Sequence, residues 1–575
     1  MPRSPFFDRL ARTIRIAHYC EERKISTGEG LERFAEAEAR EAKRRQTRRE
    51  FLADVGRIAA VGAAATIAGP FEAFARPPSA GLDVGIVGAG LAGLACFDRF
   101  KKAGTTPFLY EASTRVGGRC FSVSRAKPAP GNIFFPGQVG ERGGEFIDNL
   151  HKTMLGYATE LGLTKEDYFD NPGEIFYRFG GVTRSEAQIV DIYRQFVPII
   201  NDDVRRLSSS SLTAFAHSPH DEALDNTSLA EYLDGQNAAG EPFDPVLAAA
   251  LGEAYRGEYG LDPEEQSTLN FILFIASNRS SKLKLFGNQS NERWHIREGN
   301  EEIPRRLAGR KLGLVHESTG AVLDTQHLKT GWRLTRARNN GSKIALTFDA
   351  AGKIKTVEHT FVVITIPFSV LRGVTLDANL GIGANLNQLE AIQSLGYGTN
   401  VKTLVGTTSR PWSSHGGNGT TYVTGLPGAQ ISFETNFADA MNPQTGSGAI
   451  LTDYRSGVEG ATLNGIPLQQ AAATFLSRLD TVFDANGAFL ASARRVNGKI
   501  VAHREHWPTN PLSQGSYTCY RPGQFTRFCE TEGQPAGNLF FAGEHTNSFH
   551  IWQGFMEGGC LSGIDAANAI IAAAP

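Results

Sequence analysis

Three glycines and one acid, between residues 88 and 111, have the types and spacing needed to bind a dinucleotide. Gly88 permits a tight turn, Gly90 lets the backbone approach a pyrophosphate, and Gly93 lets a helix pack against a strand. Glu111 follows the next apolar run and is placed to accept hydrogen bonds from a ribose. A helix that starts at the glycines would also present free backbone amides to phosphate. The elements that must position these residues are predicted strands at 84–87 and 107–110 and a predicted helix at 91–103.

The residues after Glu111 indicate which dinucleotide is bound. Residues 115–119 read Arg-Val-Gly-Gly-Arg. This resembles the extension found in flavin amine oxidases and glutathione-reductase-like flavoproteins, where the loop wraps the pyrophosphate of FAD and arginine supplies the opposite charge. The resemblance adds Arg115, Gly118 and Arg119 to the expected cofactor-binding residues.

A second glycine-rich segment lies near the C-terminus. Residues 538–546 read as a strand that runs into Phe-Ala-Gly-Glu, and a glycine-rich turn and an alanine-rich helix follow. This resembles the C-terminal flavin-binding segment of the flavin amine oxidases. The resemblance implies that Gly543 and Glu544 hold the ribityl chain and that the backbone of Met556 faces the flavin ring. A helix starting near Glu557 would direct its positive end at the flavin N1–C2 edge.

Further matches extend the resemblance across most of residues 83–570. Lys402 matches a family lysine that holds a water near flavin N5, and a lysine in an apolar strand is costly unless it is paired or hydrated. Val322 resembles the residue whose backbone contacts adenine, and Trp507 lies in the segment beside the dimethylbenzene ring. Ser516 stands where some monoamine oxidases carry a cysteine bonded to flavin, so FAD is expected to be non-covalent.

Aromatic residues are expected to form the reaction site. Tyr517 matches one wall of the family's aromatic cage, and Phe555 stands where the other wall is usually tyrosine. Two aromatic faces orient a neutral amine, and Trp552 is a further candidate for the lining. The implied reaction passes a hydride equivalent from CH–NH2 to flavin, after which the imine hydrolyses and O2 is reduced to H2O2.

The substrate class stays open between a primary amine and an L-amino acid. L-amino acid oxidases of this family carry an arginine that clamps the carboxylate, but Phe146 occupies the corresponding place. Asp148 is close to the acid of polyamine oxidases, and with Glu145 it would suit a second ammonium group. Arg142, however, is a candidate for the carboxylate clamp from another direction. Arg297 and Arg521 are the other two candidate clamps.

Three other function classes compete with the oxidase. An L-amino acid 2-monooxygenase similar to tryptophan 2-monooxygenase would share the fold but release an amide and CO2. An FAD-dependent C–C desaturase would share the fingerprint without needing Lys402 or Tyr517. A non-enzymatic flavoprotein or NAD-binding protein is the last alternative.

Length and composition set the remaining limits. The 575 residues suggest more than one domain, and a net charge of -2 gives no case for nucleic-acid binding. Six cysteines without a CxxC pair predict neither a disulfide framework nor a metal site, and no apolar run is long enough for a confident membrane span. The family resemblance suggests a homodimer.

We expect an α/β fold, with a Rossmann-like FAD-binding domain and an inserted α+β substrate domain. The FAD-binding domain is expected at 81–150, 291–384 and 501–575, and the substrate domain at 151–290 and 385–500.

The N-terminal residues are expected to stand apart from this fold. Residues 1–46 form a polar, basic, helix-prone leader, and residues 47–75 resemble a twin-arginine export signal with a cleavage site before Arg76. This predicts a periplasmic or secreted protein. The competing interpretation is an amphipathic helix on a cytoplasmic protein.

Overall fold

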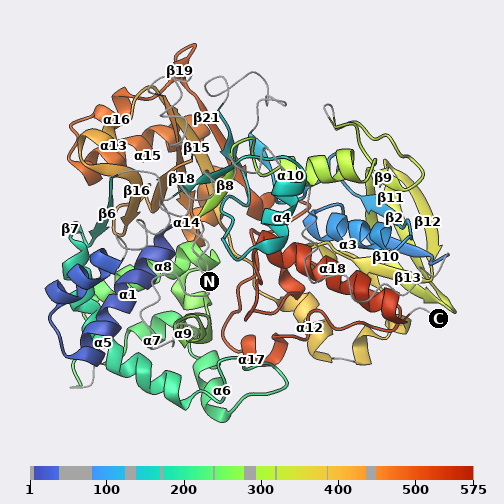
Figure 1. The fold of residues 1–575 in the computed structure, drawn as a ribbon, viewed down its shortest axis with the longest axis horizontal. Coiled ribbons are helices and arrows are strands. Elements are labelled where there is room, and N and C mark those ends of the chain that lie inside the picture. Colours follow the sequence, from blue (N-terminus) through green and yellow to red (C-terminus); the bar gives the residue numbers. More distant parts are fainter. Residues whose placement is uncertain are drawn as a thin grey trace, which may run out of the picture.

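The protein has two main sheets with helices packed around them (Figure 1). The computed structural model describes residues 5–37, 81–123, 138–168, 173–236, 240–276, 293–317, 320–384, 386–435 and 448–573.

A five-stranded parallel sheet forms the right-hand part of Figure 1. Three of its strands, β1, β13 and β22, are buried and apolar, as expected where helices or sheets cover both faces. Helices α3 (Leu91–Lys102) and α18 (Met556–Ala573) pack side by side on it. Gly563 allows this contact, because a Cβ there would lie 2.1 Å from the carbonyl oxygen of Ala92. The strand order is β22 (Leu539–Phe541), β13 (Phe361–Ile364), β1 (Val84–Val87), β2 (Phe108–Glu111) and β9 (Leu328–Thr330).

A four-stranded sheet packs close to this parallel sheet, and the ring of Tyr110 stacks on Phe348 at 4.7 Å. Its order is β12 (Lys353–His359), β11 (Lys343–Ala350), β10 (Trp332–Asn340) and β14 (Thr375–Leu376).

The left-hand part of Figure 1 contains a seven-stranded, mainly antiparallel sheet with helices against it. The strand order is β21 (Ala502–His506), β15 (Val401–Thr407), β18 (Ala449–Arg455), β17 (Ile431–Glu434), β16 (Gly417–Val423), β6 (Glu174–Phe179) and β7 (Val182–Arg184). The longer helices here are α5 (Glu186–Arg206), α8 (Pro245–Tyr259), α9 (Thr268–Ala276) and α15 (Leu468–Phe483).

Shorter elements connect these layers. The helices are α4 (Lys152–Glu160), α6 (Pro219–Asn226), α7 (Leu229–Leu233), α10 (Glu302–Arg306), α11 (Phe368–Leu371), α12 (Leu386–Ser394), α13 (Pro411–Ser414), α14 (Gly457–Thr462), α16 (Ala488–Ala491) and α17 (Phe525–Phe528). The strands are β3 (Ser122–Val123), β4 (Gly140–Glu141), β5 (Lys165–Asp167), β8 (Trp294–Ile296), β19 (Arg495–Val496) and β20 (Lys499–Ile500).

The expectation that the N-terminal residues stand apart from the fold is wrong for residues 5–37. Helix α1 (Pro5–Arg23) packs against α5 and α8, and its residues Ile16 and Cys20 are fully buried in the same core as those helices. Arg194 of α5 donates to Glu21 at 2.7 Å, which ties the two elements together. The twin-arginine segment, residues 47–75, lies outside the described residues and stays a prediction.

The strand–helix–strand pattern around the glycines is confirmed: β1, α3 and β2 match the predicted limits to within a residue. The domain boundaries stay a prediction. No helix in the described part of the chain is long and apolar enough to cross a membrane. All six cysteines are buried thiols.

Candidate active site

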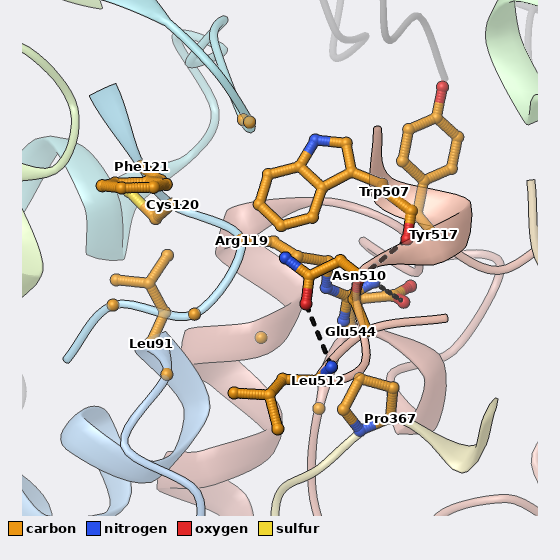
Figure 2. A pocket seen from close by; sticks show the side chains of 18 of the residues that line it. Leu91, Arg119, Cys120, Phe121, Pro367, Trp507, Asn510, Leu512, Tyr517 and Glu544 are labelled. Carbon is orange, nitrogen blue, oxygen red and sulfur yellow. Dashed lines mark hydrogen bonds and ion pairs between the residues drawn. The ribbon is translucent and has the colours of Figure 1, made fainter. Parts of the chain in front are cut away.

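A cavity of about 390 Å³ is lined by residues of both main sheets and of α18. This volume is within the range of small-molecule and cofactor sites. In Figure 2, Leu91 and Phe121 lie on one side of the view, and Tyr517 and Pro367 lie on the other. The cavity brings together fifteen of the residues predicted from sequence: Gly88, Gly90, Glu111, Arg115, Gly118, Arg119, Arg142, Glu145, Lys402, Trp507, Tyr517, Gly543, Glu544, Phe555 and Met556.

The glycine turn leaves room for a phosphate. Gly88 has φ +106°, a conformation that disfavours a side chain, and a Cβ on Gly90 would meet nothing within 4 Å. A Cβ on Gly93 would lie 1.9 Å from the carbonyl oxygen of Gly88, so this glycine is needed for helix packing rather than for lining the cavity. Helix α3 has no side-chain cap, so its first amides are available to an anion.

Glu111 is fixed beside this turn by two backbone amides. Its carboxylate accepts from Ala89 N at 2.7 Å and from Ser113 N at 2.8 Å.

Helix α18 also begins at the cavity, where Met556 and Gly559 line it. Two helix N-termini therefore meet one cavity, which favours a bound group with negative charge.

Two arginines add positive charge. Arg115 donates to the carbonyl oxygens of Val116 and Gly118 and lies 3.6 Å from the centre of the Phe121 ring. Burial lowers the pKa of Arg115. Arg119 donates to Ser516 O at 2.7 Å and pairs with Glu544 at 3.0 Å. With the open glycine turn, these guanidinium groups fit an anionic dinucleotide such as FAD.

Lys402 and Glu145 form a buried ion pair in the same cavity. Lys402 Nζ lies 2.6 Å from Glu145 Oε2 and donates to the carbonyl oxygen of Gly143 at 2.8 Å. The exposed fractions of the two side chains are 8% and 3%. In the strand register, Lys402 is opposite Tyr454 on β18 and Glu505 on β21.

Four aromatic side chains line the cavity near Lys402, and we call them the aromatic pocket: Phe146, Phe433, Tyr454 and Tyr517. The rings of Phe146 and Phe433 are 5.6 Å apart, and those of Phe433 and Tyr454 are 6.2 Å apart. The Tyr454 and Tyr517 hydroxyls are 2.7 Å apart, and Tyr517 donates to Gly257 O at 3.1 Å. Lys402 Nζ lies 5.8 Å from the centre of the Phe433 ring.

Arg142 lines the cavity and is already paired with a carboxylate of the protein. Its guanidinium pairs with Glu505 at 2.5 Å and lies 3.8 Å from the centre of the Phe121 ring. Arg297 pairs with Glu166 and Arg521 pairs with Glu265, and neither lines the cavity.

Besides Gly93, three predicted site residues do not line the cavity. Asp148 is fully buried and its carboxylate accepts from Leu150 N at 2.6 Å, so it stabilises the turn before α4. The ring of Trp552 lies 5.6 Å from that of Phe555 and 4.4 Å from that of His151. Val322 forms an isolated bridge with Val315. The cavity is lined instead by Trp332, Arg333 and Leu334, which follow the strand that pairs with β2.

Sequence reasoning missed Glu505, Phe433 and Tyr454, which also line the cavity. Their proximity to Lys402 depends on strand pairing between segments about 50 to 100 residues apart, which a single sequence does not display. For Glu505, its place two residues before Trp507 was the available signal.

The parallel sheet, the glycine turn and the arginine-lined cavity together indicate a dinucleotide-binding protein. The chain belongs to the flavin-containing amine oxidoreductase family, whose model matches residues 91–571. A flavin is therefore the implied cofactor, and the open turn at Gly90 and the guanidinium groups of Arg115 and Arg119 fit its phosphates.

The proteins similar to this chain are named after several different substrates. The flavin-dependent L-tryptophan oxidase RebO of Lentzea aerocolonigenes is 24% identical over 508 residues, covering 84% of this chain and 97% of that protein. An L-amino-acid oxidase of Bungarus fasciatus is 20% identical, covering 84% and 86%. The solved structure of cyclohexylamine oxidase from Brevibacterium oxydans has a TM-score of 0.67 at 19% identity, covering 86% of this chain and 99% of the other. Wild-type putrescine oxidase bound to putrescine has a TM-score of 0.66 at 19% identity, covering 85% and 99%.

Proposed function

We propose that this protein is an FAD-dependent oxidase that converts a primary amine to an imine, which hydrolyses to a carbonyl compound and ammonia while O2 is reduced to H2O2. The observation that carries this proposal is the aromatic pocket, beside which Lys402 is already paired with Glu145. Such a pocket suits an apolar amine better than a substrate with a free carboxylate.

The charges along the whole cavity support the same choice. Arg119 pairs with Glu544, Arg142 with Glu505, and Arg333 with Asp349. Arg115, the remaining arginine among the described lining residues, bonds to carbonyl oxygens of the loop that carries it. A substrate carboxylate would have to compete with these partners. At Arg142 it would compete with Glu505, which accepts from Nε at 2.7 Å and lies 2.5 Å from Nη2.

Bound flavin would accept the electrons of the C–H bond, so no acid–base pair of side chains is required for that step. The chain's own residues hold and orient the substrate. The faces of Tyr517 and Phe555 restrict its position, the pocket rings exclude water, and the hydrogen bond of Tyr517 to Gly257 O fixes that ring.

We further propose that FAD is held without a covalent bond. Ser516 lines the cavity and donates its hydroxyl to Asn400 Oδ1 at 2.6 Å, and it offers no thiol for a flavin linkage. Acid precipitation of the yellow protein tests this: flavin is expected in the supernatant, and flavin retained in the pellet would contradict it.

An L-amino acid is the second candidate substrate, because the names of the two curated relatives above include an L-tryptophan oxidase and an L-amino-acid oxidase. It predicts activity that depends on an arginine. If Arg142 is the clamp, Arg142→Ala would raise the KM for an amino acid selectively, and an unchanged KM would remove that assignment.

Anaerobic mixing with matched substrates decides between the candidates. Tryptamine and L-tryptophan, or phenethylamine and L-phenylalanine, differ by the carboxylate alone. We expect the amines to bleach the flavin at least about tenfold faster at equal concentration, since burying a carboxylate without a partner is costly. Faster bleaching by the amino acids would favour the second candidate. Bleaching with an amide and CO2 as products would indicate a monooxygenase, and no bleaching by either class would favour a desaturase.

A further inference from the structure

The buried carboxylate of Glu145 has contacts that a simple substrate-binding acid would not need. One oxygen pairs with Lys402 Nζ at 2.6 Å, and the other accepts from Thr435 Oγ1 at 3.1 Å. Thr435 Oγ1 in turn lies 2.6 Å from Thr452 Oγ1. Glu145 is therefore held by Lys402 of β15 and by Thr435, which follows β17, and its negative charge is already matched.

The backbone before Glu145 is fixed by close packing. A Cβ on Gly143 would lie 1.7 Å from the carbonyl oxygen of Arg119, and one on Gly144 would lie 2.8 Å from Met556 Sδ. Gly143 and Gly144 line the cavity together with Arg119 and Met556, the two residues they approach. This packing leaves little freedom to Gly143 O or to the Glu145 side chain, which are the two acceptors for Lys402.

A lysine ammonium has three N–H donors arranged tetrahedrally. Two of those of Lys402 are used by Glu145 and Gly143 O, and the side chain lines the cavity between the rings of Phe433 and Tyr454. Fixing two donors fixes the direction of the third. We propose that Glu145 is a positioning residue, which with Gly143 O holds the Lys402 ammonium so that its remaining N–H and its charge act on the flavin.

The surrounding charges do not provide this function. Glu505 lies opposite Lys402 on the neighbouring strand, but it pairs with Arg142. Glu141 accepts from Asn300 N and from the hydroxyl of Ser122. Glu145 is thus the carboxylate, among the described lining residues, that contacts Lys402 directly. The inference rests on the flavin cofactor but not on which substrate the enzyme oxidises.

Sulfite titration of the oxidised holoenzyme tests the proposal without a substrate. The sulfur lone pair of sulfite forms a bond to flavin N5, and the electron pair enters the ring, so the adduct is anionic and the visible flavin absorbance is lost. A nearby ammonium stabilises this anion, and the dissociation constant therefore reports the charge that the flavin experiences.

The design is a double-mutant cycle of Glu145→Gln with Lys402→Met, which isolates what Glu145 does through Lys402. We expect Glu145→Gln to change the sulfite dissociation constant at least about fivefold with Lys402 present and less than about twofold with methionine at that position. Glu145→Asp, which keeps the charge, should return the constant toward that of the unmodified protein. Equal effects of Glu145→Gln in both backgrounds would overturn the proposal.

Glu505→Gln serves as the matched control, because Glu505 is a buried carboxylate of the same cavity that does not bond to Lys402. Its effect should add to that of Lys402→Met. If Glu145→Gln fails to retain flavin, Thr435→Val replaces it in the cycle, since that change removes one anchor of Glu145 and leaves the carboxylate. Coupling between Thr435→Val and Lys402→Met then supports the proposal, and additivity contradicts it.

Discussion

At the scale of single residues, Gly93 shows how an absent side chain can determine cofactor binding. The site of a Cβ at this position lies 1.9 Å from Gly88 O, within the turn that leaves space over Gly90. We expect Gly93→Ala to push α3 away from β1 and to destabilise the protein by roughly 1–3 kcal/mol, the range seen for overpacking. The flavin content of the purified protein, read from its absorbance ratio, should fall with it.

Gly156 supplies the control for this prediction. It is also a helical glycine, on α4, but a Cβ there would meet nothing within 4 Å. Gly156→Ala should therefore leave the flavin content unchanged and raise stability by up to about 1 kcal/mol. Equal flavin content in both variants would show that the contact at Gly93 is not what maintains the turn.

We expect the proposed role of Tyr517 to depend on its ring more than on its hydroxyl. The hydroxyl makes hydrogen bonds with Tyr454 and with Gly257 O, each worth about 1 kcal/mol. We expect Tyr517→Phe to lower kcat/KM by about tenfold or less, and Tyr517→Leu to lower it by roughly tenfold more, because leucine also removes the aromatic face. Steady-state assays at saturating and at limiting amine concentrations give kcat/KM for both variants. A loss in Tyr517→Phe as large as the loss in Tyr517→Leu would assign the function to the hydroxyl instead.

At the scale of elements, the local sequence pattern was sufficient to predict β1, α3 and β2, because one short stretch of chain contains the strands, the turn and the helix. The same stretch also identified Gly88, Gly90 and Glu111 as lining residues. Val322 does not line the cavity, and its predicted adenine contact stays a prediction. The residues that line this end of the cavity are set by the pairing of β9 with β2 and by the start of β10. Strands β9 and β2 lie more than 200 residues apart in sequence.

At the substrate end of the cavity, the sequence predicted the types of the lining residues but not which residues pair with them. Lys402 in an apolar strand indicated a paired or hydrated lysine, and the partner proved to be Glu145 from a distant segment. Phe146, which by resemblance occupies the place of the family's carboxylate-clamping arginine, lines the cavity. Arg142 could not be assigned from sequence, since its pairing with Glu505 depends on how β21 is placed.

Helix α1 carries a prediction about the N-terminal residues. Ile16 is fully buried in the core shared with α5 and α8, so Ile16→Ala should destabilise the folded chain by about 2–5 kcal/mol. The control is Glu22→Ala, an exposed position of the same helix, which should change little. Thermal unfolding of the full-length chain gives the comparison.

The same measurement bears on export. We propose, on the twin-arginine resemblance of residues 47–75, that the protein is exported. A chain cleaved before Arg76 would be severed from α1, and Ile16→Ala would then alter its stability only if α1 stayed bound. N-terminal sequencing of the protein from cells shows which chain is present, and an intact N-terminus in the cytoplasm would contradict export.

At the scale of the whole molecule, buried titratable groups make stability depend on pH in two opposite ways. Burial raises the pKa of Glu141 and of Glu532 to about 8, and it lowers the pKa of His18 and of His545 to about 4. Between pH 4.5 and 8 the unfolded carboxyls have lost protons that the folded ones keep, so stability falls as pH rises. Between pH 6.5 and 4 the unfolded histidines hold protons that the folded ones lack, so stability falls as pH falls.

Above pH 6.5 the histidine contribution is constant and only the carboxyl contribution changes. We therefore expect the midpoint of thermal unfolding to fall from pH 6.5 to pH 8, by the equivalent of on the order of 2 kcal/mol for each buried carboxyl. Glu532 accepts a hydrogen bond from Tyr520 at 2.5 Å, and Glu532→Gln keeps that acceptor while removing the proton. This variant should show a clearly smaller fall, whereas Glu222→Gln at an exposed position should match the unmodified protein. An unchanged fall in Glu532→Gln would mean that Glu532 is ionised in the folded protein, in which case burial is offset by interactions that stabilise its charge.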